Sequence, residues 1–127
     1  MKTKFEDLEI YILSEKLADE VWGMVIKWDH FPKSTLGVQL VNSADGVGSN
    51  IAEGSGKGSF IDFRRYMRIS RGSLYETKHW LRRSNTRKLM SQEEIDTIKP
   101  LIDELLPRIN AFINYLNKKI NKSKSSL

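Results

Sequence analysis

Basic residues recur at helical spacing in the second half of the chain, and their side chains are suited to binding phosphate. Arginine pairs with a phosphate through parallel hydrogen bonds, and side chains about 5–6 Å apart on a helix can meet several phosphates. An aromatic ring among them can stack on an unpaired base, which favours single-stranded or looped RNA over a closed duplex. The stripe consists of Arg64, Arg68, Arg71, Tyr75, Lys78 and Arg82, and it is widened by Arg65 and Arg83.

The stripe has other interpretations. Between Ser59 and Lys88 nine residues are basic and two are acidic, so the excess of charge is real. A basic helix face is often only solvated, or it pairs with acids elsewhere in the same fold. It can also bind an acidic protein partner. The sequence favours a nucleic-acid-binding face and leaves these alternatives open.

A glycine-rich segment, Gly54 to Gly58, precedes the stripe and invites a phosphate-loop interpretation. The P-loop pattern requires a glycine where Ile51 stands and a serine or threonine where Gly58 stands. The dinucleotide pattern fails as well, because Ser59 occupies the place of its third glycine. We expect a turn in which glycines supply positive φ. Lys57 and the amides of this turn remain candidates for meeting a phosphate.

Residue types that carry catalysis or bind metals are sparse. His30 and His79 are the only histidines, and neither belongs to a recognised ligand motif, so we expect no metal site and no cofactor. Glu53 is expected at the end of the second helix and Glu76 within the third, where they could approach one another or bond to amides at a helix end. Glu53 is best explained by a structural hydrogen bond. The sequence therefore predicts that the protein is not an enzyme.

Composition places the chain among ordinary soluble domains. Its 127 residues are enough for one domain with its own core, and the absence of cysteine fits a reducing cytoplasm. Acids interrupt the first twenty residues, and no apolar run reaches the roughly 18 residues of a membrane span. We expect a cytoplasmic protein without a membrane partner. Residues 1–63 carry a net charge of −4 and residues 64–127 carry +9, so the two halves are electrostatically opposite.

Apolar residues recur at spacings of three and four in four stretches, which predicts four helices. We expect them at about 7–28, 36–54, 60–84 and 92–119, with a break at Pro32 and a cap from Ser34 or Thr35 before the second. Ser59 and the pair Ser91 and Glu94 are expected to cap the third and fourth.

Short connections between amphipathic helices imply an all-α, up-down-up-down antiparallel four-helix bundle. Residues 1–119 should form this single domain, and residues 120–127 should be a disordered basic tail. The second helix carries Gly37, Ala44, Gly46 and Gly48, which indicates close approach to a neighbouring helix, either within the bundle or between subunits. Local flexibility at a hinge is the alternative. Pro100 and Pro107 lie inside the fourth and are expected to kink or divide it.

Several of these residues together resemble a known family. They are Gln39 with Ala44, the run Asn50-Ile51-Ala52-Glu53-Gly54, Phe63, and Arg71-Gly72-Ser73-Leu74 with Glu76. The resemblance is to the four-helix-bundle proteins encoded in intervening sequences of bacterial 23S rRNA genes, and it covers nearly the whole chain.

The resemblance implies a bundle that assembles into a ring, with five subunits favoured. It also implies a likeness to the accessory protein of diversity-generating retroelements, a basic pentamer that binds nucleic acid and reverse transcriptase. The family pattern usually has two arginines where this chain has Val41 and Asn42, which removes two charges from the implied binding surface. Independently, an acidic first helix meeting the basic third helix of the next subunit would close a ring.

We therefore expect a non-enzymatic, oligomeric four-helix bundle that binds RNA or DNA through its third helix. The alternative is a structural or scaffold protein that uses the same basic face for subunit assembly or for a protein partner. The residues expected to bind nucleic acid are Lys57, Arg64, Arg65, Arg68, Arg71, Tyr75, Lys78, Arg82 and Arg83.

Overall fold

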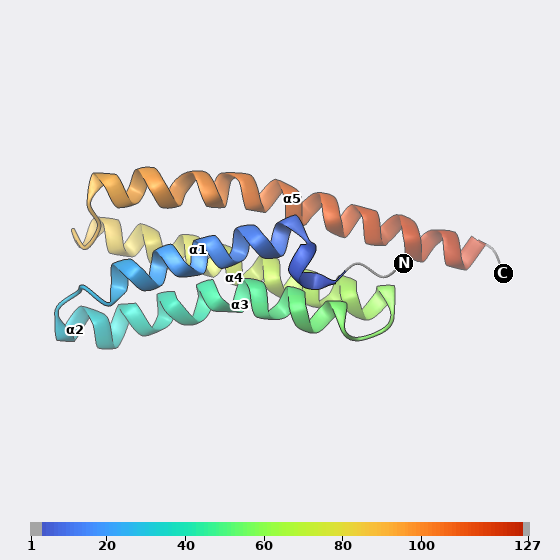
Figure 1. Cartoon of the computed structure of the whole chain (residues 1–127), viewed down its shortest axis with the longest axis horizontal. Helices are drawn as coiled ribbons and strands as arrows, with labels where there is room; N and C mark the ends of the chain where they lie inside the picture. Colours follow the sequence, from blue (N-terminus) through green and yellow to red (C-terminus); the bar gives the residue numbers. More distant parts are fainter. Residues whose placement is uncertain (1–3, 126–127) are drawn as a thin grey trace.

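The chain folds into four long helices joined by short connections (Figure 1). The computed structural model describes residues 4–125. This part of the chain begins with a 3-10 turn, η1 (Phe5–Asp7), and then forms α1 (Glu9–Val25). A short helix, α2 (His30–Pro32), continues through the π-helical segment η2 (Lys33–Gly37) into α3 (Val38–Ser55). The last two helices are α4 (Phe60–Thr86) and α5 (Gln92–Ser125). Neighbouring helices pack in the order α1, α3, α4, α5 and back to α1. The predicted all-α four-helix bundle is confirmed.

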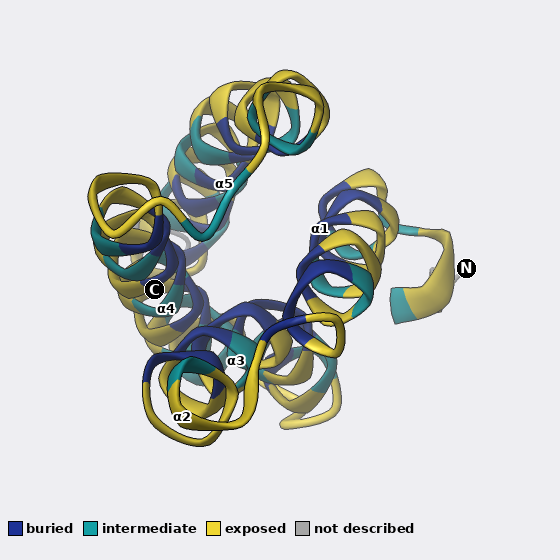
Figure 2. Cartoon of the chain, turned by 90° about the vertical axis from the view of Figure 1, so that its left-hand side faces the viewer, coloured by how far each residue is buried: buried dark blue, intermediate teal, exposed yellow. Residues whose placement is uncertain are grey.

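The buried residues of the four long helices face the centre of the bundle (Figure 2), and most of them are apolar. Fully buried side chains include Leu17, Leu40, Met67, Leu74 and Leu105. The few buried hydroxyl groups are hydrogen-bonded, and no buried side-chain nitrogen or oxygen within residues 4–125 lacks a partner. The core is therefore apolar with its polar groups satisfied.

Two serines begin helices as predicted. The Ser59 hydroxyl accepts a hydrogen bond from the Asp62 amide at 3.1 Å, at the start of α4. At the start of α5 the Glu94 amide donates to the Ser91 hydroxyl, and the Glu94 carboxylate accepts from the Ser91 amide. Both caps satisfy amides that the first turn of a helix leaves without partners.

The small residues of α3 allow it to approach its neighbours closely. A Cβ atom on Gly48 would lie 2.8 Å from the Ser14 hydroxyl of α1, and one on Gly54 would lie 2.6 Å from the Tyr66 Cβ of α4. The predicted close approach is confirmed, and it occurs inside the bundle. Gly54 is therefore part of α3 and of its packing, whereas the positive φ of the following turn belongs to Gly58.

The expected break at Pro32 is wrong. The chain is helical from His30 to Ser55, because Pro32 lies in the first turn, where the missing amide hydrogen is not needed. The hydroxyl groups of Ser34 and Thr35 donate back to the Phe31 carbonyl and cap no helix start.

The last helix differs from the expectation at both prolines and at its end. Pro100 and Pro107 lie on the exposed side of α5, and the helix continues through both. It also passes the expected end at Lys119 and reaches Ser125, because Ile120 continues the buried apolar row. Residues 120–125 of the expected tail are thus helical, and 126–127 lie outside the described residues. Within residues 4–125, no helix has the length and apolar character needed to span a bilayer.

Candidate nucleic-acid interface

Helix α4 presents its basic residues to solvent because its apolar residues are fixed inward. Met67, Leu74 and Leu81 lie in the core, and Ser70 and Thr77 face α3. The Ser70 hydroxyl donates to the Val47 carbonyl at 2.7 Å, and the Thr77 hydroxyl donates to the Ser43 hydroxyl at 3.0 Å. These bonds set the rotation of α4 about its axis, so that the opposite side of the helix points outward.

The outermost row of α4 consists of exposed residues, which we call the outer row: Arg65, Arg68, Tyr75 and Arg82. Successive members from Arg68 onward are seven residues, or about two helical turns, apart. The exposed Lys78 lies beside this row, and its ammonium is 5.8 Å from the centre of the Tyr75 ring. Tyr75 is 52% exposed, so its ring is accessible from solvent. The outer row therefore combines cations with one aromatic surface.

Two arginines of the predicted stripe lie apart from this row, toward α5. The Arg64 guanidinium donates to the Asn117 side-chain oxygen at 2.8 Å, and the Arg71 guanidinium donates to that of Asn110 at 2.9 Å. Both arginines are half-buried. Their first role in the fold is to join α4 to α5, and the single predicted stripe is in fact two rows with different surroundings.

The remaining predicted residues lie at the two ends of α4. Near its start, Lys57 lies 3.7 Å from the Glu53 carboxylate, and both Lys57 and Arg65 lie over the Tyr66 ring, at 5.3 and 4.6 Å from its centre. Arg65 also approaches Asp62 at 4.0 Å, a long and exposed ion pair that holds the arginine weakly. Near the other end, Arg83 is half-buried.

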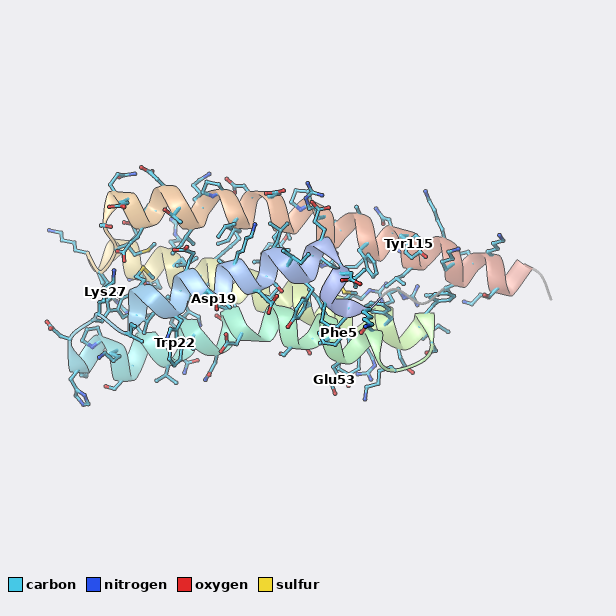
Figure 3. The ribbon with its side chains drawn as sticks, viewed as in Figure 1. Phe5, Asp19, Trp22, Lys27, Glu53 and Tyr115 are labelled. Carbon is cyan, nitrogen blue, oxygen red and sulfur yellow. The ribbon has the colours of Figure 1, made fainter. Side chains whose placement is uncertain are left out.

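On the opposite side of the bundle the surface is acidic and partly apolar. Asp19 and Trp22 lie on the outward side of α1 (Figure 3), and Trp22 is 56% exposed. Burial raises the pKa of Asp45 on α3, and the nearby Asp19 carboxylate raises it further. Burial also raises the pKa of Tyr11, with the Glu15 carboxylate acting in the same direction.

The Asp45→Asn substitution should raise the free energy of unfolding slightly at neutral pH. Because the pKa of Asp45 is raised in the folded state, its ionised form destabilises the fold above the ordinary pKa of aspartate. Below that pKa the carboxyl is protonated in both states, and the gain should disappear. Urea unfolding at about pH 7 and about pH 3 measures the difference. Asp103→Asn is the control, because it removes the ion pair with Lys99 and should not stabilise.

The carboxylates considered for catalysis are held in separate structural contacts. Glu53 accepts a hydrogen bond from the Tyr66 hydroxyl at 3.2 Å, which confirms the structural role predicted for it. Glu76 accepts one from the Trp80 indole at 3.4 Å, and His79 packs edge-on against the same indole. Among the described residues, no three histidine, aspartate or glutamate side chains are grouped as metal ligands.

The asparagines of α5 are the contacts that sequence reasoning missed. Asn110 and Asn117 are seven residues apart, as are their partners Arg71 and Arg64. This matching spacing, read in opposite directions along two antiparallel helices, is the signal that would have separated the two arginine rows. A basic stripe read on one helix alone contains no information about the polar residues that face it.

Comparison with known proteins agrees with this architecture. Residues 6–111 match the family model for the 23S rRNA-intervening sequence protein. A solved structure of a protein of unknown function from the S23 ribosomal protein family of Bacteroides thetaiotaomicron superposes with a TM-score of 0.73 at 20% identity, over 82% of this chain and 97% of that one. No match was found among curated proteins. Since the family match covers most of the chain, this protein belongs to the 23S rRNA-intervening sequence protein family.

Proposed function

We propose that this chain binds single-stranded or looped RNA, with little sequence preference, through the outer row of α4. The observation that carries the proposal is the exposure of Arg65, Arg68, Tyr75 and Arg82 along one side of a rigid helix. Asp62 and Glu76 are the only acidic residues in α4, and Glu76 is bonded to Trp80. A phosphate backbone lying along α4 would therefore meet mostly cations.

Both parts of the row have a role in this proposal. The guanidinium groups would neutralise phosphates and release their counterions, which supplies affinity without reading sequence. Tyr75 would stack on an unpaired base, which duplexes do not offer. The family is named after sequences that interrupt 23S rRNA, so structured and single-stranded RNA are the first ligands to test.

Binding to labelled single-stranded RNA should weaken steeply as salt rises. For single strands, a plot of the logarithm of the binding constant against the logarithm of the salt concentration has a negative slope. Each phosphate contacted contributes about −0.7 to that slope. Three or four contacts therefore predict a slope of about −2 to −3. Fluorescence anisotropy across a salt series, with duplex DNA as the comparison, measures it. No binding at low salt, or affinity that does not change with salt, would contradict the proposal.

The second candidate use of the same arginines is assembly of the protein into a ring, with five copies favoured. The acidic and partly apolar outer side of α1 supports it, because Trp22 and Ile26 are 56% and 50% exposed beside Asp19. If this side of one copy met the outer row of the next, the contact would be heterologous and could close. An acidic protein partner would engage the outer row in the same way. Assembly and RNA binding make different predictions for the same substitutions.

We propose a non-enzymatic role in the cytoplasm. Glu53 and Glu76 each accept a hydrogen bond from a different aromatic side chain, so these two carboxylates are not paired for acid and base catalysis. The proposed activity needs only a fixed arrangement of charges and one stacking surface, which a rigid bundle provides.

A further inference from the structure

Helix α5 runs past the ends of the other three long helices (Figure 1). Arg108 of α5 forms an ion pair with Glu9, the first residue of α1, at 2.6 Å. Beyond Arg108 the helix continues to Ser125, which is about 25 Å at a rise of about 1.5 Å per residue. Along this length α5 extends past the start of α1 and no longer has α1 beside it.

A groove of about 930 Å3 lies where α1 is missing. Its floor includes an aromatic row in which the Phe63 and Phe112 rings are 5.1 Å apart and the Phe112 and Tyr115 rings are 5.6 Å apart. Phe60, Ile61 and Tyr115 line it and are 43%, 56% and 48% exposed, so three large side chains are exposed in one groove. Figure 3 labels Tyr115 on this part of α5. The groove is thus an apolar surface without a cover in the chain as described.

The groove begins at Leu8, directly before α1, and is lined by the end of α3, the start of α4 and the last part of α5. Nearer the middle of the bundle α1 completes the ring of four helices, and at this end the chain before α1 does not continue along that path. Instead η1 packs against both α3 and α1, and Phe5 of η1 stacks edge-on against Tyr11 of α1. Figure 2 shows η1 outside the ring of helices. We propose that the groove binds one amphipathic helix of a partner protein, which takes the place that α1 holds in the rest of the bundle.

The charge around the groove specifies the partner further. From Asn110 to Ser125, α5 carries four lysines and no acidic residue. Lys124 lines the groove, and Lys119 lies over the Tyr115 ring at 5.5 Å from its centre. A helix seated with its apolar side on the aromatic row would turn its edges toward these lysines. Acidic residues beside the apolar stripe would therefore be favoured and lysines disfavoured.

A second copy of this chain fits the groove less well than a separate helix. The acidic helix α1 is flanked on both sides by α3 and α5, so only its outer side is available, whereas a helix seated in the groove would meet residues of α3, α4 and α5. The projecting part of α5 from a second copy would place lysines against lysines. The partner is accordingly a helix that is free on most of its circumference. This inference uses residues other than the outer row and does not depend on RNA binding.

The test uses the full chain and a pair of designed peptides. Each peptide is a labelled helix of about 17 residues, matching the projecting length at about 1.5 Å per residue, with leucines at i, i+3, i+4 and i+7. One carries glutamates on its polar side, and the other carries lysines at the same positions. Fluorescence anisotropy should show saturable binding of the acidic peptide and at least about tenfold weaker binding of the basic one.

Two matched double variants locate the binding site. Ile61→Ser with Tyr115→Ser changes exposed groove residues and should weaken binding of the acidic peptide at least about tenfold. Ile12→Ser with Phe31→Ser also replaces one isoleucine and one aromatic residue, at exposed positions of α1 and α2 that do not line the groove, and it should alter affinity by less than about twofold.

Three results would overturn the proposal. The first is absence of saturable binding of the acidic peptide up to about 1 mM, and the second is an equal loss of affinity in the two double variants. The third is a lower mass of the protein alone after Ile61→Ser with Tyr115→Ser, measured by sedimentation velocity, because it would assign the groove to a second copy. The RNA titration is unaffected by any of these outcomes, so the two proposals fail separately.

Discussion

Reversing the charge of Arg68 and Arg82 together should lower the affinity for single-stranded RNA by about 100-fold or more. Each arginine is exposed on the outer row and is proposed to contact a phosphate through charged hydrogen bonds, which contribute about 1.5–3 kcal/mol apiece. Two lost contacts alone reach about 100-fold, and two new carboxylates add repulsion. Anisotropy at fixed low salt measures the change. The fold should survive, because neither side chain is buried.

The control for this experiment reverses two lysines that lie outside α4. Lys16 and Lys33 are exposed, and Lys16→Glu with Lys33→Glu changes the net charge by the same amount. It should reduce affinity far less, since it acts only through the overall charge. Equal losses in the two double variants would mean that no defined face binds the RNA.

The mass of the same Arg68→Glu and Arg82→Glu variant separates RNA binding from assembly. If the outer row binds RNA alone, sedimentation velocity should give an unchanged mass. If the variant formed a smaller assembly and kept its RNA affinity, we would assign these arginines to a contact between subunits. The exposed Trp22 of α1 and Ile26, which follows α1, would then be the first residues to change on the other side of that contact.

The inner arginines provide a third comparison. Arg64→Gln with Arg71→Gln should cost less RNA affinity than the outer pair, because both side chains are already bonded to Asn117 and Asn110. It should also lower the free energy of unfolding slightly, since two bonds between α4 and α5 are weakened. If this variant instead lost more RNA affinity than the variant of the outer pair, the RNA would have to lie over the junction of α4 and α5.

Local chemistry was sufficient to predict most of the architecture. The helical period of the apolar residues identified four helices, and the serine caps at Ser59 and Ser91 located two helix starts. These features depend on residues within one turn of each other, which a sequence displays directly. Pro32 shows the limit, because proline is compatible with a first helical turn and with a break, and the packing of the following residues decides between them.

The candidate site was predicted only in part, for a related reason. Spacing on α4 grouped Arg64 and Arg71 with Arg68, yet whether an arginine faces solvent or a neighbouring helix depends on the rotation of α4 and on what α5 presents. The Ser70 and Thr77 bonds to α3 fix that rotation, and Asn110 and Asn117 receive the inner arginines. The groove beside Tyr115 was likewise hidden, since it results from a difference in helix lengths.

Gly54→Ala should lower the free energy of unfolding by about 2 kcal/mol or more. Its Cβ would lie 2.6 Å from the Tyr66 Cβ and 3.1 Å from a Phe63 ring carbon, and 3.4 Å from the Phe63 carbonyl oxygen. Two of these atoms belong to the α4 backbone or are attached to it, so no side-chain rotation relieves the contact. The helices must separate, and core packing around Ile51 and Met67 weakens with them. Urea unfolding measures the change.

Gly72→Ala, on α4, should have the opposite effect and raise the free energy of unfolding. Gly72 is inside α4 and exposed, and a Cβ there would meet nothing within 4 Å. Replacing a glycine in a helix interior then gains about 1 kcal/mol, because alanine loses less backbone entropy on folding. Opposite signs for the two variants would establish that Gly54 serves close packing of α3 against α4. A gain in stability in both variants would instead assign both glycines to helix propensity.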